Sequence, residues 1–176
     1  MATTVEIRPL RPSDDRSGFV SGEPALDRHF QHYAGQNQFK LRLSVTYVAL
    51  LDGHIVGFAT VASSSLERQA LPDARLKRRL PSYPLPVLRL ARLAVDGTSQ
   101  GLGIGKRLLR HVLALALEQR DTTGCAGVVV DANPGAQTFY EGLGFTALEG
   151  VREGRTHGAP SPMFLAIQEL AGANEG

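Results

Sequence analysis

The sequence contains a single cysteine, no tryptophan and only 6% aromatic residues in its 176 positions. Because Cys125 has no second cysteine to pair with in the chain, an intrachain disulfide is excluded, and the reducing cytoplasm is the expected location. No apolar run approaches the roughly 20 residues that a membrane-spanning helix needs. The polar N-terminus lacks the apolar segment of a secretory signal. With one cysteine and five scattered histidines, no metal site is expected.

The composition that remains, 43% hydrophobic and 20% charged, is that of an ordinary globular protein, and the length predicts one domain over residues 1–176. The net charge of +2 hides an asymmetry, because no acidic residue occurs between Asp73 and Asp96. This stretch, called the basic block below, holds six of the 19 basic residues: Arg75, Lys77, Arg78, Arg79, Arg89 and Arg92. A local excess of positive charge indicates an anionic partner at one face.

Hydrophobic periodicity predicts an α/β protein with a mixed central sheet flanked by helices. Strands are expected over residues 5–10, 45–51, 54–63, 87–95, 126–131 and 163–167, and helices from 24 to about 34, over 105–120 and over 136–143. Asp52-Gly53 is a typical turn of a two-residue hairpin, so the early strands should form an antiparallel meander. A β-α-β unit follows, and residues 66–80 should form a loop with a short helix.

The stretch Gln100-Gly101-Leu102-Gly103-Ile104-Gly105-Lys106 is the most informative in the chain. It lies between a predicted strand and the longest predicted helix. Glycines let the backbone approach a ligand closely, and the N–H groups at a helix start bind phosphate. Lys106 would add positive charge. The alternative is a plain strand-to-helix turn, for which one glycine would suffice; the three alternate glycines favour phosphate binding.

Two motifs resemble the signatures of the GNAT acetyltransferases, which bind acetyl-coenzyme A. Gln100-x-x-Gly103-x-Gly105 is similar to the first signature, and the segment from Asn133 through Phe139-Tyr140-Glu141 to Gly144-Phe145 is similar to the second. The predicted order of strands and helices also matches, so the resemblance covers nearly the whole chain and implies the GNAT fold.

The resemblance implies roles for individual residues. Tyr140 would be the catalytic acid that protonates the leaving thiolate, although it could also be an aromatic packing residue. Backbone groups of the central strand would pair with the pantetheine arm and polarise the acetyl carbonyl. The residues implied to bind acetyl-CoA are Leu93, Ala94, Val95, Gln100, Gly101, Gly103, Gly105, Lys106, Asn133 and Phe139.

A closer resemblance is to the GNAT toxins of bacterial toxin–antitoxin modules, carried by residues 26–38, 78–96 and 128–145. It implies acetylation of the α-amino group of an aminoacyl-tRNA, a block of translation, a ribbon-helix-helix antitoxin and a homodimer. The basic block would then bind tRNA phosphates. It could instead hold the cofactor's phosphates or be a solvated surface.

Two other functions remain open at this stage. One is a GNAT enzyme that acetylates a small-molecule amine or a protein N-terminus. The other is an inactive GNAT fold that binds acetyl-CoA as a regulator, against which the glycine loop and Tyr140 argue. A dedicated general base is not required, because an α-amino group with a pKa near 8 is partly neutral at pH 7. The histidines are therefore interpreted as surface or packing residues.

Overall fold

A computed structural model describes residues 4–148 and 160–174, with the side chains of the last helix described up to Leu170. The strands are β1 (Val5–Pro9), β2 (Val45–Leu51), β3 (His54–Leu66), β4 (Leu85–Val95), β5 (Gly127–Ala132), β6 (Thr146–Ala147) and β7 (Ser161–Ala166). The α-helices are α1 (Pro24–Arg28), α2 (Ala74–Arg79), α3 (Ile104–Thr122), α4 (Gln137–Glu141) and α5 (Ile167–Asn174). Shorter helical segments are η1 (His29–Tyr33), η2 (Gln36–Lys40), η3 (Arg68–Ala70) and η4 (Gly97–Ser99).

The seven strands form a mixed sheet in the order β1-β2-β3-β4-β5-β7-β6, which confirms the predicted fold class. The chain divides into two compact units. The first holds residues 1–62 and 90–114, and the second holds residues 63–89 and 115–176. Each unit combines two separate segments of the sequence, and the divisions between the units fall within β3, β4 and α3. The single-domain assignment stays a prediction.

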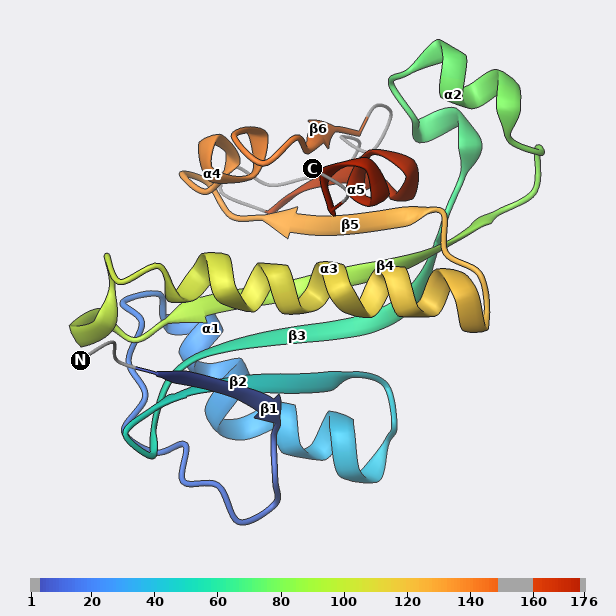
Figure 1. Cartoon of the computed structure of the whole chain (residues 1–176). Coiled ribbons are helices and arrows are strands. Elements are labelled where there is room, and N and C mark those ends of the chain that lie inside the picture. The colour runs from blue at the N-terminus through green and yellow to red at the C-terminus, as the bar shows by residue number, and fades with distance from the viewer. Residues whose placement is uncertain (1–3, 149–159, 175–176) are drawn as a thin grey trace. The chain divides into compact units, whose positions relative to one another are not determined.

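The first unit is built on the predicted antiparallel meander of β1, β2 and β3. Asp52 and Gly53 have φ values of 51° and 79°, the two positive values that a type I′ hairpin turn requires, so the predicted turn is confirmed. The core against the helix that begins at α1 contains Phe19, Phe30 and Phe58, and the last two rings stack with their centroids 4.4 Å apart. Figure 1 shows this helix in blue beside β1 and β2.

The first helix is longer than its sequence pattern predicts. It begins at Pro24, as expected for proline in a first turn, but continues beyond the predicted end near Ala34 to Lys40. Its middle and end, η1 and η2, are π-helical. An α-helical period of 3.6 residues does not describe such a helix, which is why the periodicity ended the prediction early.

A close approach between α3 and the sheet explains the glycine in the middle of β3. A Cβ atom on Gly57 would lie 3.0 Å from Leu108 Cδ1 and 3.2 Å from the Ala94 carbonyl oxygen. A side chain at this position would therefore push the helix away from the strand. The predicted helix over 105–120 is confirmed, with one further residue at its start and two at its end.

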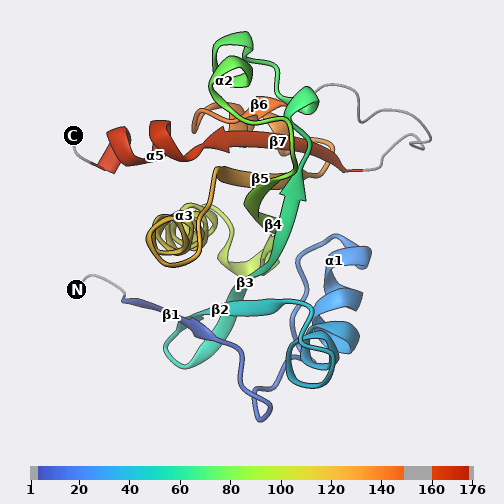
Figure 2. The same cartoon turned by 90° about the vertical axis from the view of Figure 1, so that its right-hand side faces the viewer.

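The second unit contains the antiparallel strands β5, β7 and β6 together with α2, α4 and α5. Phe164 of β7 packs with Leu71, Val87 and Val129 in its core. The sequence pattern missed two elements here. Strand β6 has only two residues, too few for any periodicity, and Ile167 begins α5 where the last strand was predicted to end. Figure 2 shows α5 continuing directly from β7.

Candidate active site

The glycine loop of the first unit has the backbone that its sequence predicts. Gly101 and Gly103 have φ values of 85° and 78°, a region that residues with a Cβ atom rarely adopt. A Cβ atom built at either glycine would have no described heavy atom within 4 Å. The loop therefore presents bare backbone to open space, as a site for a bulky phosphate group requires.

The start of α3 adds further backbone groups to the glycine loop. Its first α-helical turn closes with Arg107 N–H donating to the Gly103 carbonyl, at 3.2 Å. By helix geometry, the N–H groups of Ile104, Gly105 and Lys106 precede that bond and have no acceptor within the helix. The first turn contains no acidic residue, and the Lys106 side chain is exposed. These groups fit the pyrophosphate of coenzyme A by hydrogen bonding and by the positive end of the helix dipole.

Gln100 supports the loop with its side chain. Its amide nitrogen Nε2 donates to the carbonyl oxygens of Val95, at 3.2 Å, and Ser21, at 3.1 Å. The loop is thereby fastened to the end of β4. Of the three strand residues implied to bind the pantetheine arm, Ala94 packs in the core, while Leu93 and Val95 are half-buried. These side chains leave a backbone role possible, and the cofactor-binding assignments stay predictions.

Tyr140 lies in the second unit, on the short helix α4, and is only 5% exposed. Its ring packs edge-on against Phe139 and Phe145, with centroids 5.2 and 5.6 Å away. Burial, and secondly the negative charge of Asp131, raises the pKa of Tyr140 well above its usual value. The hydroxyl therefore keeps its proton at neutral pH. Among residues 4–148 and 160–174, no hydrogen bond to this hydroxyl is found.

The carboxylate that acts on Tyr140 is itself paired with a residue of the basic block. Arg89 donates two hydrogen bonds to Asp131, from Nε to Oδ2 at 3.0 Å and from Nη2 to Oδ1 at 3.1 Å. The pair is partly exposed, with side chains 32% and 22% accessible. Sequence reasoning missed Asp131, although a carboxylate at the end of an apolar strand, Val128-Val129-Val130-Asp131, was a usable signal.

Asn133 and Phe139 flank this region of the second unit. The Asn133 carbonyl accepts the Ala136 N–H at 2.9 Å, and Gly135 has a φ of 92°, so Asn133 forms the turn that leads into α4. Phe139 is half-buried against Tyr140. The local structure around the second motif is therefore a tight turn followed by one short helix that carries Tyr140.

The six residues of the basic block lie in different surroundings. Four of its residues lie on α2, whose first turn is capped by Asp73; of these, Arg75, Arg78 and Arg79 are exposed and Lys77 is half-buried. Arg89 is held by Asp131, whereas Arg92 is exposed on β4. Helix α2 presents a cationic surface, and Arg68 secures its end by donating to the carbonyls of Lys77 and Leu80.

A buried polar network crosses the first unit beneath η1. His29 Nε2 lies 3.2 Å from the hydroxyl of Thr60, which lies 2.8 Å from the hydroxyl of Thr46. Burial, and secondly the positive charge of Arg92, lowers the pKa of His29 to about 4. The imidazole is therefore neutral at pH 7 and accepts a proton poorly. Of the other histidines, His32 and His54 are exposed, His111 is partly buried against Tyr47, and His157 lies outside the described residues.

This lowered pKa predicts a pH-dependent stability. In the unfolded chain His29 binds a proton below pH 6.5, but in the folded protein only below about pH 4. The free energy of unfolding should therefore fall as the pH drops from 6.5 to 4, by about 2–3 kcal/mol. Chemical denaturation at several pH values should show a flatter profile for His29→Gln. The exposed-site control His32→Gln should keep the wild-type profile, and identical profiles for all three proteins would contradict the prediction.

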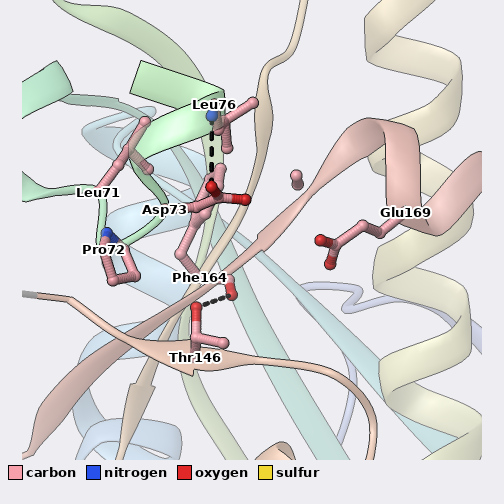
Figure 3. A pocket seen from close by; sticks show the side chains of 8 residues that line it. Leu71, Pro72, Asp73, Leu76, Thr146, Phe164 and Glu169 are labelled. Carbon is pink, nitrogen blue, oxygen red and sulfur yellow. Dashed lines mark hydrogen bonds between the residues drawn. The ribbon is translucent and has the colours of Figure 1, made fainter. Parts of the chain in front are cut away.

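A cavity of about 260 Å³ lies elsewhere in the second unit (Figure 3). Leu71, Leu76 and Phe164 supply apolar walls, and Asp73 and Glu169 supply carboxylates. None of the residues predicted to bind acetyl-CoA lines it. Within residues 4–148 and 160–174, no helix is long and apolar enough to cross a membrane, and no three His, Cys, Asp or Glu side chains gather as metal ligands would.

Comparison with known proteins identifies the family. Residues 42–147 match the acetyltransferase (GNAT) domain. The chain is 37% identical, over 134 residues, to the tRNA-acetylating toxin of Mycobacterium tuberculosis (strain ATCC 25618 / H37Rv), covering 76% of this chain and 79% of that protein. The chain therefore belongs to the GNAT acetyltransferases, the family whose acetyl donor is acetyl-CoA, and is an N-acetyltransferase.

Two solved structures are similar over almost their full length. AtaT complexed with acetyl-methionyl-tRNAfMet is 26% identical, with a TM-score of 0.85 and coverage of 97% of this chain and 99% of that one. AtaTR bound with acetyl-CoA is also 26% identical, with a TM-score of 0.78 and coverage of 97% and 98%. The predicted family and fold are thus confirmed.

Proposed function

We propose that this chain is a toxin that transfers the acetyl group of acetyl-CoA to the α-amino group of an aminoacyl-tRNA and so blocks translation. The observation that carries the proposal is the 37% identity to a tRNA-acetylating toxin. The similarity to AtaT, solved with acetyl-methionyl-tRNA, supports the same substrate class. We further propose a cytoplasmic homodimer that is neutralised by a ribbon-helix-helix antitoxin.

Each group of residues would have one role in acetyl transfer. Acetyl-CoA supplies an activated thioester. The cradle of Gly101, Gly103 and the first turn of α3 would hold its phosphates, and backbone groups of Leu93, Ala94 and Val95 would hold the pantetheine arm. The acceptor amine attacks without a dedicated base, because part of it is neutral at pH 7. Tyr140, fully protonated at that pH, would donate its proton to the departing sulfur. The proton that the nitrogen loses as the amide forms would pass to solvent, and the tyrosine would take up a proton again before the next turnover.

The acceptor is tested by comparing charged tRNA, uncharged tRNA and a panel of small amines. Of the two tRNA forms, only charged tRNA carries a free α-amino group, so label from acetyl-CoA should appear on the amino acid and be released with it after ester hydrolysis. Efficient acetylation of small amines, with no transfer to any aminoacyl-tRNA, would instead assign the enzyme to the small-amine or N-terminal class.

Helix α2 gives a prediction about RNA affinity. The double charge reversal Arg78→Glu/Arg79→Glu should weaken tRNA binding far more than acetyl-CoA binding, because both side chains are exposed and lie outside the glycine loop. Each lost phosphate contact should reduce the slope of log affinity against log salt by about 0.9, taking duplex DNA as the guide. Filter binding over a salt series measures both effects.

The matched control for this measurement is Arg11→Glu. Arg11 is also exposed but lies outside the basic block, so its reversal should leave the salt slope unchanged. Equal slopes for the wild type and the double variant would exclude α2 from the RNA interface while leaving the fold and the cofactor site unaffected.

A further inference from the structure

In the helix from Pro24 to Lys40, residues four positions apart lie above one another and form columns parallel to the helix axis. A π turn contains more residues than the 3.6 of an α turn, so a helix that mixes both repeats after about four residues. The burial follows this repeat: Leu26, Phe30, Ala34 and Gln38, spaced by four, are all buried. The opposite column, Arg28, His32, Gln36 and Lys40, is exposed throughout. In an all-α helix, each column would drift around the axis.

Another column of the helix, which continues to the capping residue Leu41, contains one exposed aromatic side chain and one exposed apolar side chain. It starts at His29, which is buried against Thr60, and continues through Tyr33, Asn37 and Leu41. Tyr33 and Leu41 are each 51% exposed, and Leu43 just beyond the helix is 62% exposed. The Asn37 carbonyl accepts the Leu43 N–H at 2.9 Å, which folds the chain back at the helix end. We call Tyr33, Asn37 and Leu41, with Lys40 and Arg42 beside them, the Tyr33 face.

The segment of the sequence that carries this face has charges of one sign. No acidic residue occurs between Asp27 and Asp52, a second acid-free stretch besides the basic block. Lys40 and Arg42 are exposed at the end of the face. At its start, the positive charge of Arg92 contributes, after burial, to lowering the pKa of His29. Because His29 is neutral at pH 7, it contributes no positive charge of its own.

Arg42 occupies a backbone position that suits glycine better. Its φ of 57° lies in the left-handed region, directly after the last helical turn, where glycine is the usual residue. A side chain at this conformation strains the backbone. The arginine therefore reduces stability relative to glycine at a position where its side chain points to solvent, and such a departure suggests that its charge is used.

We propose that the Tyr33 face binds the single-stranded 3′ end of an RNA substrate. The inference rests on the proposed function, in which that end carries the reacting amine. Single-stranded RNA is bound by exposed aromatic rings that stack on bases and by cations that follow the backbone. The face offers Tyr33 for stacking, the Asn37 amide for a base edge, and Lys40 and Arg42 for phosphates. A protein helix is the less suitable occupant, because the polar Asn37 interrupts the apolar column.

The test uses two RNA hairpins that mimic an acceptor stem, one with a four-nucleotide 3′ overhang and one blunt. Stacking of one base on an aromatic ring contributes about 1–3 kcal/mol, so Tyr33→Ala should weaken binding of the overhang hairpin about 5- to 150-fold. It should leave the blunt hairpin unchanged. Tyr33→Phe, which keeps the ring, should bind nearly as the wild type does. The control Val20→Ala removes an apolar side chain that is also exposed, at 58%, but lies outside the face and outside the basic block, and should not change the preference for the overhang.

Arg42→Gly distinguishes an effect on RNA binding from an effect on the stability of the protein. It should raise the thermal midpoint, because the strain is relieved, yet lower the salt slope of overhang binding by about 0.7. Equal affinities of the wild type for both hairpins, or no effect of Tyr33→Ala on the overhang hairpin, would overturn the inference. If Tyr33→Ala and Leu41→Ala weaken only the binding of an acidic peptide, the face belongs to a protein partner and the proposal is also overturned. If instead the wild type prefers the overhang through Tyr33 but acetylates no aminoacyl-tRNA, the proposed function fails and this inference stands.

Discussion

Replacing Gly103 with glutamate is expected to abolish acetyl-CoA binding while the protein remains folded. The substituted carboxylate would enter the open space above the loop and repel the phosphates that the α3 N–H groups would otherwise hold. Hydrogen bonds to charged groups contribute about 1.5–3 kcal/mol each, so losing two of them should weaken binding at least about 100-fold. Titration calorimetry with acetyl-CoA measures this loss directly.

The control for Gly103→Glu is Gly53→Glu. Gly53 has nearly the same φ, 79° against 78°, and also has no described heavy atom within 4 Å of an added Cβ. Both variants therefore suffer similar backbone strain, of about 1–2 kcal/mol, and similar loss of thermal stability. Only the glycine-loop variant should lose the cofactor. Unchanged acetyl-CoA affinity in folded Gly103→Glu would remove the glycine loop from the site.

The second large effect is expected for Tyr140→Phe, which should slow acetyl transfer about 100-fold or more without weakening acetyl-CoA binding. The substitution removes one hydroxyl and keeps the ring that packs between Phe139 and Phe145, so folding should be little affected. Single-turnover rates, measured beside the calorimetric affinity for acetyl-CoA, separate the two effects. Tyr83→Phe, which removes an exposed hydroxyl instead, should transfer acetyl at the wild-type rate.

The pH dependence adds a second readout for Tyr140. Because burial and Asp131 raise the pKa of its hydroxyl, the proton stays in place up to at least pH 10, the ordinary value for tyrosine. Loss of activity through deprotonation of Tyr140 should therefore not appear below that pH. A Phe variant that turns over as fast as the wild type would mean that the leaving thiolate takes its proton from another source, such as water.

The pair of Arg89 and Asp131 shows why the basic block cannot be treated as one surface. Two of the guanidinium N–H groups of Arg89 are engaged by the carboxylate whose charge also acts on Tyr140. Arg75, Arg78 and Arg79 are exposed and form no ion pair with a described residue. Charge reversal on α2 is therefore the cleaner test of RNA binding, whereas changes at Arg89 would also alter the surroundings of the proposed acid.

The sequence by itself determined the features that are local. The glycine loop, the Asp52-Gly53 turn and the helix that carries Tyr140 each depend on neighbouring residues, because positive φ angles, caps and periodicity are properties of short segments. For the same reason the two motifs were sufficient to predict the family and the cofactor, which the comparisons confirm. The roles of the individual site residues remain predictions.

Only the tertiary structure decided which distant residues meet. Arg89 and Asp131 are 42 positions apart, Gln100 and Ser21 are 79 apart, and His29 and Thr60 are 31 apart. Such pairs depend on strand order and on how helices pack on the sheet, which no local pattern encodes. The π turns are a further case, because the column of Tyr33, Asn37 and Leu41 exists only once the helix packs with a repeat of about four residues.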